Sequence, residues 1–126
     1  MASELRVNTL KDSAGNNSIG MSYVAEGSAK AWVNFTTSSS TTNLDSFNVA
    51  SLTDNGTGDT TITYTNAMNT DNYSSVGTCG EQNTTASNRI FSIGTKIAAS
   101  IRVHGATTTA VDDHPENNAV IHGDLA

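Results

Sequence analysis

A glycine-rich turn between two strand-like runs is the feature that most constrains how this chain can fold. Residues 46–67 contain the turn sequence Asp54-Asn55-Gly56-Thr57-Gly58. Asn-Gly is the dipeptide that most readily adopts the positive φ angles of a tight hairpin. After the turn, Ile62 and Tyr64 alternate with threonines, which is the period-two pattern of a half-buried strand. The sequence therefore predicts a β-hairpin at this point.

The first strand of this hairpin interrupts the alternation. Phe47 and Val49 share one face, whereas Leu52 has the opposite parity. A β-bulge near Ala50 or Ser51 would turn Leu52 inward again, because a bulge adds one residue to one strand of a pair. The side chains that we expect this hairpin to place in the core are Phe47, Val49, Ile62 and Tyr64.

The rest of the chain is also patterned as short strands. Alternating apolar residues recur at 5–10, 29–35 and 89–103; residues 73–80 are a further expected strand, and the short apolar run at 119–123 suits a closing strand. Thr95 interrupts the longest of these runs, which is compatible with two strands or with one bent strand. No stretch shows a sustained helical period, and we expect residues 18–29 to follow an irregular path. Short strands separated by turn residues predict an all-β fold, an antiparallel β-sandwich or a jelly-roll-like domain.

The chain is long enough for one globular core. Its N-terminal part is predicted to lie outside that core. We predict an oligomerisation or attachment segment with an irregular polar linker over residues 1–43, and a globular β domain over residues 44–126. The short strand pattern near the N-terminus has too few apolar side chains to be stable alone, so it should pair with the body or with another copy. The candidate oligomer-interface residues are Leu5, Val7, Leu10, Ile19 and Trp32. Trp32 lies on the polar side of its strand. Three roles for this side chain remain as alternatives: an anchor in a subunit interface, packing beneath a loop, or an aromatic platform for a sugar.

Charge and hydropathy argue against several classes of partner. Twelve acidic residues against six basic ones give a formal net charge of -6. No cluster of Lys or Arg is present to neutralise phosphates, so we do not expect nucleic-acid binding. No apolar run approaches the roughly 20 residues of a membrane span, and the N-terminus lacks the features of a signal peptide. We therefore expect a soluble chain that is made in the cytosol and does not insert into membranes.

The residues that carry reactive chemistry are few. Cys79 is the single cysteine, which excludes an internal disulfide. Four candidate metal ligands gather within five residues, namely Asp112, Asp113, His114 and Glu116. Calcium loops usually contain a glycine, and zinc sites usually need several His or Cys at set spacings, so a solvated acidic loop is the favoured interpretation. We predict no cofactor and, since no nucleophile elbow, phosphate loop or redox motif is present, no enzymatic activity.

Several segments together resemble one known family. Residues 3–12 (SELRVNTLKD), with Ala14-Gly15-Asn16, and residues 29–35 (AKAWVNF) resemble segments common in tail-fibre-type proteins of tailed bacteriophages, especially phages of marine bacteria and cyanobacteria. Residues 45–59 (DSFNVASLTDNGTGD), continuing to 65–68 and 72–74, resemble the start of the β-rich distal domain in that family. Residues 119–124 resemble the family's ending more loosely. The resemblance covers nearly the whole chain, but the long shaft repeats that extend a fibre are missing.

The resemblance implies a structural virion protein that assembles in the host cytoplasm. It implies a homotrimer that contacts other virion proteins as a short fibre or fibre-like appendage and that contacts the host surface. A glycan-binding adhesin domain and a capsid decoration protein are alternatives, and a depolymerase is a further option. An adhesin would recognise a bacterial surface glycan through polar loops, whose candidate residues are Asn72, Tyr73, Asn83, Asn88, Asp113 and Asn117.

Overall fold

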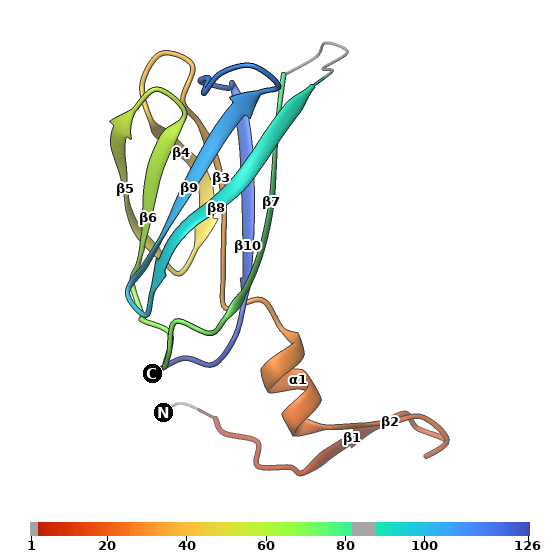
Figure 1. Ribbon diagram of the computed structural model, residues 1–126. Helices are drawn as coiled ribbons and strands as arrows, with labels where there is room; N and C mark the ends of the chain where they lie inside the picture. The colour runs from red at the N-terminus through yellow and green to blue at the C-terminus, as the bar shows by residue number, and fades with distance from the viewer. Residues whose placement is uncertain (1–2, 82–87) are drawn as a thin grey trace.

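The computed structural model, which describes residues 3–81 and 88–126, is an antiparallel β-sandwich with an N-terminal arm at one end (Figure 1). Sheet 1 has the strand order β4-β3-β10-β7, and sheet 2 has the order β5-β6-β9-β8. Sheet 1 consists of β3 (Ala31–Thr36), β4 (Thr42–Phe47), β7 (Ser74–Gly80) and β10 (Glu116–His122). Sheet 2 consists of β5 (Val49–Gly56), β6 (Asp59–Tyr64), β8 (Arg89–Ile97) and β9 (Ser100–Thr107). The all-β antiparallel sandwich predicted from the strand pattern is confirmed.

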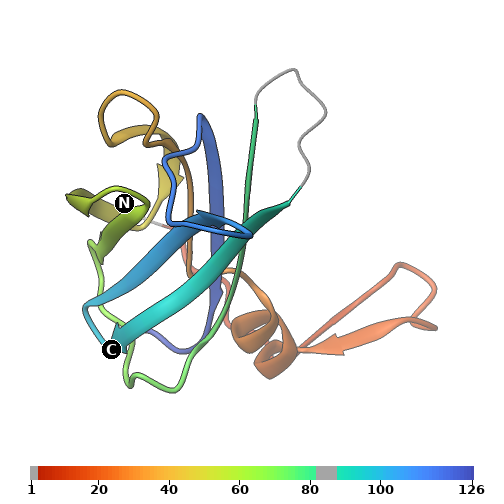
Figure 2. The ribbon, with the colours of Figure 1, turned by 45° about the horizontal axis from the view of Figure 1, so that its top comes forward.

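The arm, residues 3–27, contains two three-residue strands and one short helix. Strands β1 (Thr9–Lys11) and β2 (Ser18–Gly20) pair antiparallel, and α1 (Met21–Gly27) follows directly. Both views show the β1–β2 hairpin extending away from the sandwich (Figure 2). The irregular path predicted for residues 18–29 is therefore wrong, because elements of three and seven residues are too short to produce a periodic signal. No helix in the described part of the chain is long and apolar enough to cross a membrane.

The core lies between the inner faces of the two sheets. Ile62 pairs with Leu52 on one side and with Ile101 on the other, which brings three inward side chains into line across sheet 2. The fully or nearly buried apolar residues are Ala31, Val33, Phe35, Ile62, Tyr64, Met68, Tyr73, Ile101, Val103, Ala119 and Ile121. The predicted core positions Ile62 and Tyr64 are confirmed, and Val49 packs against the core as a partly buried residue.

Phe47 is wrong as a core prediction, because it is 54% exposed on the outside of sheet 1. The chain turns at Asn48, which separates β4 of sheet 1 from β5 of sheet 2 and has a φ of 56°. Asn adopts this left-handed conformation more readily than most residues. Its side-chain Nδ2 donates to the carbonyl oxygens of Lys30 (2.9 Å) and Asn66 (3.0 Å), and its Oδ1 accepts from the Asn66 amide (2.7 Å). These hydrogen bonds hold the corner at which the chain changes sheets.

The hairpin of β5 and β6 follows the predicted plan. Its register shifts between Val49 and Ser51, which confirms the bulge expected near this point. Gly56 pairs with Asp59 across the turn. The interruption near Thr95 is a register shift within β8, between Ile93 and Lys96. The run from 89 to 103 forms two strands, β8 and β9.

The sandwich begins earlier in the chain than the predicted boundary between residues 43 and 44. That boundary falls inside β4, and β3 lies between β4 and β10 in the middle of sheet 1. The inward side chains of β3, among them Val33 and Phe35, are buried in the core. The structure therefore places the start of the sandwich at Ala31. The predicted boundary is wrong because β3 pairs with the C-terminal strand β10, and this pairing cannot be inferred from chain order.

Candidate functional site

The predicted receptor residues are divided between the two ends of the sandwich. The loop containing Asn72 and Tyr73 lies at the end that carries the arm, whereas the β9–β10 loop and the start of β8 lie at the opposite end, which we call the tip (Figure 1). Asn88, Asp113 and Asn117 belong to the tip. Asn83 lies outside the described residues. The six candidates therefore do not form one loop cluster.

At the tip, the acidic loop of residues 112–116 is hydrogen-bonded to the β5–β6 turn. The Gly58 amide donates to Oδ1 of Asp113 at 2.8 Å, and the Gly105 amide donates to the Gly58 carbonyl at 2.8 Å. Gly58 has a φ of 64°, and a Cβ at this position would lie 2.3 Å from the Gly105 carbonyl oxygen. Asp113 thus binds a backbone amide of the glycine-rich turn at residues 54–58.

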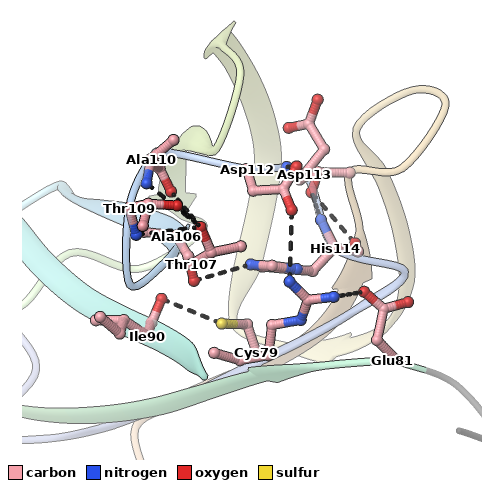
Figure 3. A network of polar contacts seen from close by, with 12 residues as sticks. Cys79, Glu81, Ile90, Ala106, Thr107, Thr109, Ala110, Asp112, Asp113 and His114 are labelled. Atoms are coloured by element: carbon pink, nitrogen blue, oxygen red, sulfur yellow. Dashed lines mark hydrogen bonds and ion pairs between the residues drawn. The ribbon is translucent and has the colours of Figure 1, made fainter. Parts of the chain in front are cut away.

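Arg89 joins three segments of the tip, and its two carboxylate partners, Glu81 and Asp112, are labelled in Figure 3. Its guanidinium pairs with Glu81 at the end of β7, and its Nη1 lies 3.6 Å from Oδ2 of Asp112. Cys79 lies nearby on β7, where its thiol donates to the Ile90 carbonyl at 3.2 Å. Burial raises the pKa of this thiol. A raised pKa lowers the thiolate fraction and hence the nucleophilicity of Cys79.

His114 and Asn117 are buried structural residues. The His114 amide donates to Oγ1 of Thr37 at 2.8 Å, and the ring Nε2 lies 3.3 Å from the Ala106 carbonyl. Nδ2 of Asn117 donates to the His114 carbonyl at 3.0 Å. Because Asn117 is only 2% exposed, it is not available as a receptor contact.

The four candidate metal ligands do not converge on one point. Asp113 binds the Gly58 amide, Asp112 faces Arg89, His114 points toward Ala106, and a carboxylate oxygen of Glu116 accepts from Nδ2 of Asn118 at 3.5 Å. Among residues 3–81 and 88–126, no group of three or more His, Cys, Asp or Glu side chains is arranged to hold a metal ion. In the described structure this loop ties strands together.

A cleft of about 390 Å³ lies at the arm end of the sandwich. It is lined by Glu26 of α1, by residues of the β6–β7 connection and by the segment after β10; the lining residues are Glu26, Asn69, Thr70, Asn72, Tyr73, Ser74, His122, Gly123 and Asp124. Amides, hydroxyls, an imidazole and carboxylates here offer both hydrogen-bond donors and acceptors. This chemistry suits a ligand with several hydroxyl groups.

Tyr73 contributes to this cleft without exposing its ring. It is 4% exposed, its hydroxyl donates to the Ser100 carbonyl at 2.9 Å, and its ring meets Tyr64 edge to face at 5.9 Å. Burial raises the pKa of Tyr73. Lys96 donates to its carbonyl at 2.8 Å. The Tyr73 ring is therefore part of the core and is not available as a sugar platform, whereas Asn72 is exposed.

The outer face of sheet 1 carries an apolar row that runs across all four strands. Trp32 on β3 pairs with Phe47 on β4 and with Val120 on β10, and Val120 pairs in turn with Val76 on β7. Val76 is 61% exposed and Phe47 54%. We call these four residues the apolar row. The sequence singles out Trp32 but predicts Phe47 in the core and does not single out Val76 or Val120, because their alignment depends on the strand register.

The arm exposes the other four candidate interface residues. Leu5, Val7, Leu10 and Ile19 all lie at the surface, with Leu5 80% exposed. Leu10 and Ile19 are direct partners across the β1–β2 pair. No residue of α1 is buried either. The five predicted interface residues thus form two separate exposed surfaces, one on the arm and one on sheet 1.

Comparisons of this chain with protein-family models, with curated proteins and with solved structures yield no match.

Proposed function

We propose that this chain is a structural virion protein of a tailed bacteriophage, a short fibre or fibre-like appendage that assembles as a homotrimer. In this proposal the arm mediates attachment and the sandwich is the globular head. The observation that carries the proposal is the arm, which exposes its apolar side chains instead of packing them on its own sandwich. The sequence resemblance supplies the virion context, and a capsid decoration protein is the alternative that shares the same geometry.

The energetics of the arm support an attachment role. A single two-stranded hairpin is at best marginally stable in water, and a helix of seven residues is well below the length at which isolated helices form. The exposed side chains Leu5, Leu10 and Ile19 also do not contribute the stabilisation that burial would give. Full burial contributes about 1.5–3 kcal/mol for each such side chain. A partner surface that covers the arm would provide this stabilisation.

Two measurements test this proposal. Light scattering of the purified chain should give the mass of a trimer at micromolar concentration, and a monomer mass would contradict it. Electron microscopy of particles labelled on this protein should then place it at the tail. A label distributed over the capsid would favour decoration, and the absence of the label from purified particles would contradict the virion assignment.

A second candidate function, binding of a bacterial surface glycan, is favoured by the polar cleft at the arm end. Asn72 and Asp124 line this cleft with His122. Replacing Asn72 and Asp124 by Ala should reduce binding of the protein to host cells at least tenfold. The matched control is Asn88→Gly at the tip, where the φ of 63° suits glycine, and it should leave binding unchanged. Equal binding by all three proteins would remove the cleft as the receptor site.

A further inference from the structure

We propose that the apolar row on sheet 1 is the surface that receives the N-terminal arm of a second copy of this chain. The inference rests on the homo-oligomer in the proposed function but not on its location in a virion. It identifies the two surfaces that meet: Leu10 and Ile19 of one copy, and Phe47, Trp32, Val120 and Val76 of its neighbour.

The two surfaces correspond in size and chemistry. Four neighbouring strands at about 4.8 Å spacing make the apolar row roughly 14 Å long, which is enough to accept a two-stranded ribbon or a short helix. Leu10 and Ile19 face each other across β1 and β2, so their side chains project from the same face of the ribbon. Both surfaces leave large apolar side chains in water in the isolated chain.

The charge distribution favours an arm as the occupant of the row. Residues 31–126 carry nine acidic and three basic residues, whereas residues 1–30 carry three of each, so the entire formal charge of -6 belongs to the sandwich. Two sandwiches stacked face to face would bring together two bodies of like charge, which is unfavourable. The arm, residues 3–27, carries three acidic and two basic residues, so its net charge of -1 gives much weaker repulsion, and its Lys11 can approach Asp45, which lies two residues before Phe47 on β4.

The cations of the sandwich are already engaged within the chain, so they do not offset the acidic charge between copies. Arg102 pairs with Asp59, Arg89 pairs with Glu81, and Lys96 donates to the Tyr73 carbonyl. In the arm Arg6 pairs with Glu4, so Lys11 is the arm cation that we expect to meet an acidic neighbour.

The connection between arm and sandwich directs the arm toward another molecule. Only residues 28–30 lie between the end of α1 and the start of β3, and three residues span at most about 10 Å. The helix joins the sandwich at the start of β3, and the β1–β2 hairpin points away from the chain's own sheet 1 (Figure 2). An arm-to-row contact is heterologous, and repeating it around a rotation axis closes a ring.

Chemical crosslinking of two differently labelled full-length chains tests this inference. Both chains carry Cys79→Ser; one also carries Leu10→Cys and the other Val76→Cys. Because each chain has one thiol, a bismaleimide linker can join these two sites only between copies. The mixture should yield a covalent heterodimer as its main product. The matched control replaces Val76→Cys with Thr53→Cys, an exposed β-branched position on the edge strand of sheet 2, and should yield at least tenfold less heterodimer.

Each other outcome overturns the inference. Equal crosslinking to both positions would indicate random encounter, and crosslinking only within a Leu10→Cys, Val76→Cys double variant at high dilution would show that the chain covers its own row. An oligomer by light scattering without the Leu10–Val76 crosslink would refute this interface while leaving the oligomer intact. A monomer by light scattering would instead contradict the proposed function as well.

A single substitution adds an independent readout. Trp32→Thr should weaken self-association at least tenfold, measured as the concentration at which the scattering mass falls to half. Far-UV circular dichroism of the same variant establishes that the sandwich is still folded. Unchanged association in a folded Trp32→Thr variant would contradict the role of the apolar row.

Discussion

The outer face of sheet 2 carries threonines and the ion pair of Arg102 with Asp59, and its exposed isoleucines lie on the edge strand β8, whereas the apolar row of sheet 1 crosses all four strands. The inner faces of the two sheets are alike, since both bury aliphatic and aromatic side chains in one core. Burial of the inner faces explains the fold and requires no partner. The difference is that apolar side chains on sheet 1 are aligned across the whole sheet, which is the basis of the proposed contact with another copy.

The largest effects should come from the inner faces and should be equal in the two sheets. Phe35 in sheet 1 and Ile101 in sheet 2 are both at most 1% exposed. Phe35→Ala and Ile101→Ala should each lower the free energy of unfolding by about 3–5 kcal/mol, because each creates a cavity in the same core. Urea denaturation followed by fluorescence measures this. A loss below about 1 kcal/mol in only one sheet would mean that the sheets do not share a core.

The corner between the sheets should be the next most sensitive position. Asn48→Ala removes the side-chain hydrogen bonds to Lys30 and Asn66. It also leaves an alanine at a φ of 56°, a left-handed conformation that alanine adopts less readily than asparagine. We expect a loss of about 2–4 kcal/mol in the free energy of unfolding. Asn48→Gly is the control, because it removes the same hydrogen bonds and relieves the backbone, so it should be about 1 kcal/mol more stable than the Ala variant. Identical stabilities of the two variants would show that backbone conformation is not a factor.

A reciprocal exchange of near-isosteric side chains tests the outer faces directly. Val76→Thr on sheet 1 and Thr53→Val on sheet 2 both change exposed positions on edge strands. Each should alter the free energy of unfolding by less than about 0.5 kcal/mol. Only Val76→Thr should weaken self-association, as measured by sedimentation velocity over a concentration series. Equal effects of the two substitutions on association would remove the distinction between the outer faces.

The smallest effect should come from the ion pair on the outer face of sheet 2. Nε of Arg102 donates to Oδ1 of Asp59 at 2.7 Å, and this interaction lowers the pKa of the Asp59 carboxyl. A carboxyl whose pKa is lowered in the folded state stabilises the fold at any pH above its unfolded-state pKa of about 3.9. This stabilisation is lost as the pH falls through the folded-state pKa. Asp59→Asn should therefore be slightly less stable than the parent at pH 7, because an exposed pair contributes little. The two thermal unfolding curves should converge as the pH is lowered through about 4 and below, and a difference that grows there would contradict the assignment.

The candidate sites could be predicted only in part. Residue types in sequence identified Trp32 and the apolar arm residues, but the apolar row is assembled by register partners on four strands. Likewise, the sequence predicts Tyr73 and Asn117 as exposed receptor residues, yet both are buried by distant strands. Local composition does not reveal which loop a neighbouring strand will cover.

The sequence by itself determined the local structure of this protein. Alternation and turn residues indicated most strands of the sandwich, the β5–β6 hairpin and its bulge, because these depend on backbone preferences and on contacts between chain neighbours. Only the tertiary structure decided that β3 pairs with the C-terminal β10, that the chain changes sheets at Asn48, and that the acidic loop binds the Gly58 turn. These features depend on contacts between residues far apart in sequence, and many such pairings satisfy the same alternating pattern until one of them fills a common core.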